Sequence, residues 1–191
     1  MFKIDLRTKA LVWIFGDGYG WSGAQKNKCF TLEQGAWPWQ QHAPYFTRDG
    51  LLVLFNNDNY QAWPGQKRQP PCATNSRAVA CRLDEDRLTA KQVWDGAIPG
   101  EAPVCPVAMG AVEPLRSGRT LVNYGMLPDN EHIGEITWRT REKYPSWSLV
   151  REIVMDGKNT VAFEVRLLPR PGATVGWQSF GAIKVYALPG V

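Results

Sequence analysis

The sequence lacks an apolar run of 18 residues and any long block of one charge, and each absence excludes a class of protein. Without such a run, no helix is expected to span a membrane. The 22 Lys and Arg residues and 18 Asp and Glu residues give a net charge of +4, and the basic residues are scattered. The charge pattern therefore predicts neither nucleic acid nor a membrane surface as a partner. Residues 1–13 lack an apolar core and a small-residue cleavage site, so no signal peptide is expected.

Cysteine is also scarce. Cys29, Cys72, Cys81 and Cys105 form no C-x-x-C pair and no zinc-type spacing, so the sequence predicts no metal site and no cofactor. One disulfide remains open, with Cys72 and Cys81 the nearest pair along the chain. Free buried thiols remain equally open.

Aromatic and turn-forming residues, by contrast, are abundant. The chain has nine Trp, 14 Pro and 18 Gly, and 44% of its 191 residues are hydrophobic. Short apolar runs bounded by turn residues dominate, and no stretch keeps a helical apolar period between two caps. These features predict an all-β fold with a substantial core.

One sequence unit recurs along the chain. A strand, a charged turn and a second strand are expected at residues 3–13, 80–96 and 134–157. A different hairpin precedes the second and third copies, at residues 44–57 and 110–125. Repeated four-strand antiparallel units are typical of β-propeller blades.

The expected architecture is a partial β-propeller domain over residues 1–191. Its blade fragments are expected at about 1–15, 44–96, 107–157 and 160–188. They add up to about three blades, and the first lacks its inner strands. Because a propeller needs more blades to close, the chain is expected to be the C-terminal part of a larger one. A β-sandwich stays open as the alternative.

The stretch GAWPWQQHAPYF, residues 35–46, contains His42, one of only two histidines. A lone histidine among aromatic residues is more often packed than catalytic. Its position favours chemistry, because the loop before the first strand of a blade faces the central channel. Neutral imidazole is a competent nucleophile, and aromatic walls such as Trp39 and Tyr45 would exclude water. The other histidine, His132, is expected in a surface loop.

Three segments resemble the bacterial arylsulfotransferases. WQQHAPYFTRDGLLVLFNND is similar to their W-x-Q-H motif followed by a strand and F-D-N-G. NSRAVACRLDEDRLTAKQVWDG resembles the S-R segment that follows in the family, and FKIDLRTKALVWIFG resembles their I-D-x-x-T-G segment. Together they cover most of residues 1–125.

The resemblance implies a six-bladed β-propeller that transfers a sulfuryl group from an aryl sulfate to a phenol, without a nucleotide sulfate donor. It implies that His42 becomes sulfated, so that the reaction passes through a sulfohistidine by ping-pong steps. By the same motif match, Arg77 and Asn57 are candidate substrate-binding residues, to which the aromatic residues add Trp39 and Tyr45. The family's further H-x-N and S-S-R-H segments have no match in this sequence.

Partners and location follow from the same resemblance. Aryl sulfates and phenols are the expected small-molecule partners, a homo-oligomer is allowed, and a periplasmic or secreted location is expected. A non-catalytic propeller that acts as a binding or scaffold fragment is the alternative.

Overall fold

The structure, a computed structural model, describes residues 1–59, 61–69, 72–129, 131–136, 139–173 and 176–186. Its elements are almost all strands, which confirms the all-β prediction. The one helix in the described residues, α1 (Gly23–Lys26), is a single turn. The strands form a two-stranded hairpin and two larger sheets.

The first sheet has the strand order β3-β7-β6-β5-β4. Its strands β4 to β7 are consecutive and antiparallel, as expected for a four-strand unit, and β3 joins parallel to β7 at the outer edge. The bounds of these strands are β3 (Thr31–Gln34), β4 (His42–Phe46), β5 (Leu51–Asn56), β6 (Arg77–Asp84) and β7 (Thr89–Asp95).

The second sheet is antiparallel with the order β11-β10-β9-β8. The separate hairpin pairs β1 with β2. The bounds of these strands are β1 (Phe2–Ile4), β2 (Leu11–Ile14), β8 (Ala111–Pro114), β9 (Arg119–Pro128), β10 (Ser146–Val154) and β11 (Val161–Leu167).

Both inner hairpins, β4–β5 and β8–β9, turn in the same way. The Gly50 amide donates to the Thr47 carbonyl at 3.0 Å, and the Gly118 amide donates to the Leu115 carbonyl at 3.1 Å. Both glycines have φ of 79°, a left-handed conformation that costs glycine little. The two glycines therefore occupy equivalent positions in the two inner hairpins.

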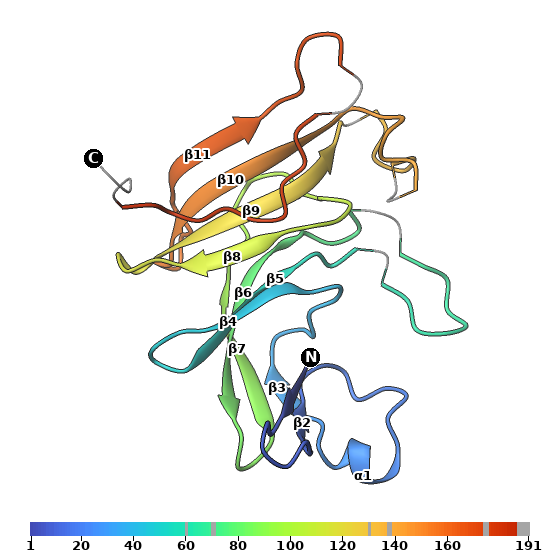
Figure 1. Cartoon of the computed structure of the whole chain (residues 1–191), viewed down its shortest axis with the longest axis vertical. Helices are drawn as coiled ribbons and strands as arrows, with labels where there is room; N and C mark the ends of the chain where they lie inside the picture. Colours follow the sequence, from blue (N-terminus) through green and yellow to red (C-terminus); the bar gives the residue numbers. More distant parts are fainter. Residues whose placement is uncertain (60, 70–71, 130, 137–138, 174–175, 187–191) are drawn as a thin grey trace.

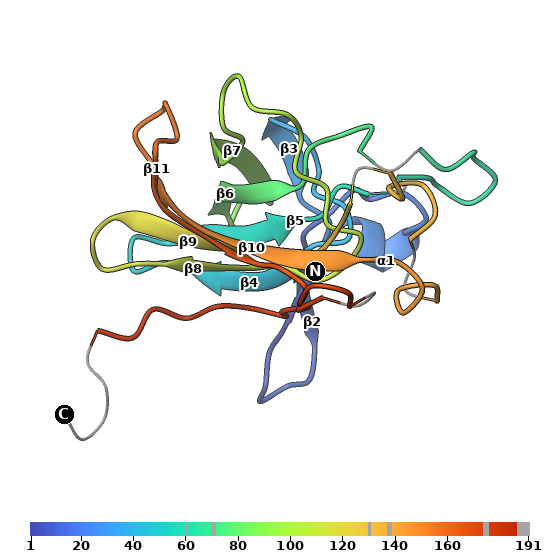
Figure 2. The same ribbon diagram turned by 90° about the horizontal axis from the view of Figure 1, so that it is seen from above.

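The two sheets and the hairpin stack as layers, with the first sheet in the middle (Figures 1 and 2). Strand β5 shows why. Its Val53 and Phe55 pack against the second sheet, whereas Leu52 and Leu54 pack against the residues around the β1–β2 hairpin. Because adjacent strand residues point to opposite faces, an uninterrupted apolar run buries both faces of a sheet. Within the described residues the layers do not close into a ring, so the six-bladed whole and the blade count stay predictions.

The second half of the chain pairs differently from the expected hairpins. Residues 134–136 and 139–145 form turns rather than a strand, and residues 137–138 lie outside the described structure. Strand β10 instead pairs with β9 and β11. The turn between β10 and β11 contains Asp156 and Gly157, with Gly157 at φ of 77°. The second four-strand unit, β8 to β11, therefore runs from residue 111 to residue 167. The Asp-Gly turn explains the pairing of β10 with β11, because Asp-Gly is a strong hairpin signal.

The expected last hairpin, over residues 160–188, is also not formed in the described residues. Residues 176–186 make an extended C-terminal strap that crosses the outer face of the second sheet (Figure 1). The Ser179 amide donates to the Gly125 carbonyl, and the Asn123 side chain donates to the Ser179 carbonyl, both at 3.0 Å. A Cβ on Gly125 would lie 2.1 Å from the Ser179 carbonyl oxygen, so the strap requires glycine there. Residues 187 and 188 lie outside the described structure.

Candidate active site

Four neighbouring strands of the first sheet start or end side by side, and their ends form one edge of the sheet. His42 begins β4, Asn56 ends β5, Arg77 begins β6 and Asp95 ends β7. The register places His42 opposite Phe55, and Asn56 opposite Arg77. Because neighbouring strands lie about 5 Å apart, the backbones of His42 and the start of β6 are about 10 Å apart. The strand register thus brings His42 and Arg77, both predicted from the sequence, to the same edge.

The backbone around His42 is unusual. The register between β4 and β5 shifts between His42 and Tyr45, as in a β-bulge. Gln40 and Ala43 have positive φ angles of 49° and 47°. A bulge re-aims a side chain, and left-handed non-glycine residues concentrate at functional sites. The irregular backbone around His42 therefore marks it as a candidate functional residue.

The side chain of His42 is exposed at the edge of the first sheet. Neighbouring atoms still remove part of its hydration, and this desolvation lowers the pKa of the imidazole below its usual value. Lowering the pKa favours the neutral ring near pH 7. A neutral, accessible imidazole can act as a nucleophile.

The loop before His42 is fixed to the end of β5. The Trp39 amide donates to Oδ1 of Asn56 at 2.8 Å, and the Asp58 amide donates to the Trp39 carbonyl at 3.0 Å. Trp39 also contacts Trp63, with 4.8 Å between ring centroids, and Tyr19 contacts Trp63 at 4.5 Å. The three rings form an aromatic cluster, Trp39–Trp63–Tyr19, whose outer member Tyr19 is exposed.

The remaining aromatic residues of this stretch divide between surface and core. Tyr45 lies on β4 with half of its surface exposed, at 51%. Trp37 packs edge-on against Phe15 at 5.2 Å, on the face of the first sheet next to the β1–β2 hairpin. Tyr45 is therefore exposed and Trp39 is half-buried within the aromatic cluster, whereas Trp37 is half-buried against the core.

Arg77 is the centre of an ion-pair network. Its Nε donates to Asp95 at 2.7 Å, and its Nη1 lies 3.1 Å from Asp58. The Asn75 carbonyl accepts a further bond from Nη1 at 2.7 Å. Burial opposes the charge, but the bonds to Asp95 and Asp58 outweigh it and hold the pKa of Arg77 above its usual value. Arg77, at the start of β6, thus links the loop after β5 to the end of β7.

Asn57 is buried in the same polar loop. Only 1% of its surface is exposed, and its backbone carbonyl accepts a bond from Ser76 Oγ. Its Oδ1 has no hydrogen-bond partner among the described residues. The Asn57 side chain is therefore buried beneath the loop and is not accessible from the surface.

A disulfide joins the two loops that flank this region, and it differs from the nearest pair along the sequence. Cys72 bonds to Cys105, with 5.4 Å between their Cα atoms. Cys81 is a free thiol that lies in the core on β6, where burial raises its pKa to about 11. Cys29 is also free. Cys81 packs in the core on the side of the β1–β2 hairpin, whereas Cys72 and Cys105 lie in loops.

Sequence reasoning missed several residues of this region. Trp63 and Tyr19 come from loops that carry no motif, so only folding brings them to Trp39. Asp58 and Asp95 stand beside recognised motifs, and their charges could have been matched with Arg77. His132 lies in a turn, as expected, where its Nδ1 is 2.6 Å from Asp129 and its ring contacts Tyr144.

The family model for arylsulfotransferase (ASST) matches residues 1–167. The chain belongs to the arylsulfotransferase family. The match ends at the last residue of β11, so it takes in both four-strand units and stops before the C-terminal strap. A search of curated proteins found no significant match. Among the residues that the structure describes, no helix is both long and apolar enough to cross a membrane.

Proposed function

We propose that this protein transfers a sulfuryl group from an aryl sulfate to a phenolic acceptor, with His42 as the nucleophile. The observation that carries the proposal is the placement of His42. Its accessible ring, with a lowered pKa, stands at a bulged strand start beside the Trp39–Trp63–Tyr19 cluster. Membership of the arylsulfotransferase family supports the reaction class.

The chemistry takes place in two displacements. A ring nitrogen of His42 attacks the sulfur, the bond from sulfur to the aryl oxygen breaks, and the phenolate leaves and takes a proton from water. The oxygen of the acceptor phenol then attacks the sulfur of the sulfohistidine. The nitrogen–sulfur bond breaks, the phenol proton passes to water, and the neutral imidazole returns. Each step needs accurate positioning more than covalent help, as in phosphoryl transfer.

The other predicted site residues take different roles in this proposal. Trp39 and Tyr45 contact the aryl ring, because both are accessible near His42. Arg77 and Asn57 act as positioning residues. Arg77 holds the Asp58 side chain by an ion pair, and the Asp58 amide donates to the Trp39 carbonyl. Asn57 lies buried next to Asp58 in the chain.

One observation favours the alternative, a non-catalytic propeller fragment. Arg77 is already paired with two carboxylates, and within the described residues it is the only cation that the motif match brings to this edge. Sulfuryl transfer needs positive donors around the sulfate oxygens. The chain alone is therefore expected to turn over slowly.

The experiment is incubation with 4-nitrophenyl sulfate, followed by mass spectrometry of the peptide that contains residue 42. The expected result is an added sulfuryl group on His42, which phenol then removes. His42→Asn should abolish the adduct, whereas the matched control His132→Asn should keep it. An adduct at another residue, or an unchanged adduct yield in His42→Asn, would contradict the proposed nucleophile. Absence of any adduct would favour the scaffold alternative.

A periplasmic or secreted location is also part of the proposal. The disulfide Cys72–Cys105 supports it, since disulfides persist in oxidising compartments.

A further inference from the structure

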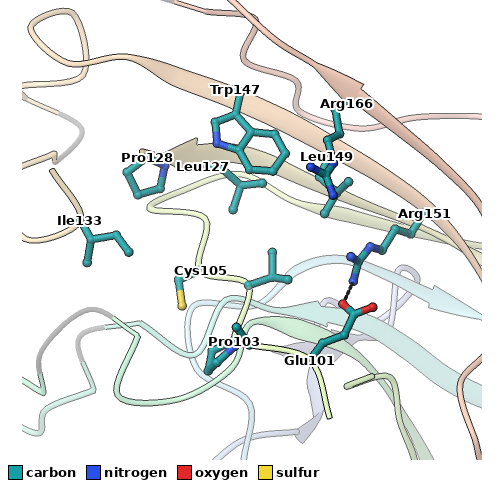
Figure 3. Close-up of a pocket in the computed structure, with 12 residues that line it drawn as sticks. Glu101, Pro103, Cys105, Leu127, Pro128, Ile133, Trp147, Leu149, Arg151 and Arg166 are labelled. Carbon is teal, nitrogen blue, oxygen red and sulfur yellow. Dashed lines mark hydrogen bonds and ion pairs between the residues drawn. The ribbon is translucent and has the colours of Figure 1, made fainter. Parts of the chain in front are cut away.

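A cavity of about 460 Å³ lies between the second sheet and the loop of residues 101–105 (Figure 3), and His42 is not among the residues that line it. Strands β9, β10 and β11 supply one side, and the loop before β8 supplies the other. None of the cavity-lining residues belongs to the edge that carries His42. The volume suits a small molecule of one or two rings.

Most of the cavity wall is apolar. Leu127, Pro128, Trp147 and Leu149 line one side in Figure 3, and Ile133 closes one end. Trp147 provides a flat surface on β10. A wall of this kind favours a flat apolar body over a hydrated ion.

Charged side chains gather at the opposite end and alternate in sign. Arg151 donates to Glu101 and to Glu164, each at 2.7 Å. Arg166 donates to the other oxygen of Glu164 through Nε, at 2.8 Å. The series Glu101–Arg151–Glu164–Arg166 is neutral as a whole, and Arg166 is its terminal cation.

The two arginines differ in how free they are to take a ligand. The Arg151 side chain is only 8% exposed, and its Nε and Nη1 already donate to Glu164 and Glu101, so it is poorly placed to take a ligand. The Arg166 side chain is 59% exposed, and the described residues offer no partner to its Nη1 and Nη2. Its guanidinium lies 5.9 Å from the Trp147 ring centroid. The Nη1 and Nη2 groups of Arg166 can therefore donate to a ligand that lies against the Trp147 ring.

We propose that this cavity binds a small aromatic anion, a flat molecule of one or two rings that carries a carboxylate or a sulfate. The ring lies against Leu127, Pro128 and Trp147, and the anionic group accepts bonds from Nη1 and Nη2 of Arg166. The planar fork of arginine suits a carboxylate or a sulfate. Cations are disfavoured because Arg151 already occupies the Glu101 carboxylate. His42 does not line this site, and binding there does not depend on sulfuryl transfer.

The test is calorimetric titration of the whole chain with 2-naphthoate, which cannot donate a sulfuryl group, and with the neutral naphthalene-2-carboxamide. We expect 2-naphthoate to bind with a Kd of about 1 mM or tighter. Arg166→Gln should weaken 2-naphthoate about tenfold and leave the carboxamide unchanged, because one charge-assisted contact is lost. Ala102→Trp, which fills the cavity from the exposed loop, should weaken both ligands.

Two control variants separate this site from the rest of the molecule. Arg82→Gln removes an exposed arginine from β6 in the first sheet and should leave binding unchanged. His42→Asn should also leave it unchanged. The proposal is overturned if 2-naphthoate does not bind at up to about 10 mM. It is equally overturned if Arg166→Gln binds like the unaltered chain, or if His42→Asn abolishes binding.

Discussion

Replacing Arg77 by methionine should destabilise the protein strongly. Asp58 has a side chain only 9% exposed and would lose its ion-pair partner, while Asp95, at 41%, would stay hydrated. Removing one partner of a buried pair costs about 3–5 kcal/mol, whereas an exposed pair contributes about 1 kcal/mol or less. Because Asp58 also bonds to Gln61, we expect the lower end, about 3 kcal/mol.

A second substitution tests the cause. In Arg77→Met/Asp58→Asn the uncompensated charge is gone, so about half or more of the lost stability should return. Arg82→Met, at an exposed position on the same strand, should change the free energy of unfolding by about 0.5 kcal/mol or less.

The assay is urea denaturation followed by tryptophan fluorescence, with midpoints and slopes compared among the variants. The reasoning is refuted if Arg77→Met unfolds at the same urea concentration as Arg82→Met. It is also refuted if the double variant is as unstable as Arg77→Met, since the buried Asp58 charge would then not be the cause.

Three further predictions test the site and the fold. Because desolvation lowers the pKa of His42, a pH profile of adduct formation should rise to half its maximum below about pH 6.5, and a midpoint above that value would contradict it. The disulfide between Cys72 and Cys105 spans 33 residues, so replacing both by serine should cost about 4 kcal/mol in urea denaturation, and a change of about 1 kcal/mol would argue against the pairing. Gly125→Ala should displace the C-terminal strap and expose it to limited proteolysis, whereas Gly134→Ala, where a Cβ meets open space, should not; equal cleavage of the two would contradict the predicted clash.

Local signals predicted the first sheet well. Residues 44–96 were expected to form four strands, and β4 to β7 span residues 42–95. The success has a local cause, since Gly50 in the inner turn and Asp84 in the outer turn fix both hairpins through short-range bonds. The second sheet was predicted less well. The Asp-Gly turn at residue 156 was taken as a separator between units, but it joins β10 to β11.

The candidate site was only partly predictable for a similar reason. The sequence placed His42 in the loop just before a strand, whereas it is the first residue of β4, and the register shift beside it involves residues within three positions. The cation Arg77 was found by motif, but its neutralisation by Asp58 and Asp95 depends on residues about 19 positions away. Trp63 reaches Trp39 only because the loop after β5 folds back.

The sequence by itself determined the all-β class, the inner hairpins and the place of His42 next to a strand, because periodicity and turn chemistry act over a few residues. The family was indicated by its motifs. Tertiary structure alone decided that Cys72 bonds to Cys105, that the strap requires Gly125, and that Trp147 and Arg166 meet in one cavity. These contacts join residues on different strands and loops. They depend on which strands pair and which faces stack, and a short-range pattern cannot specify that choice.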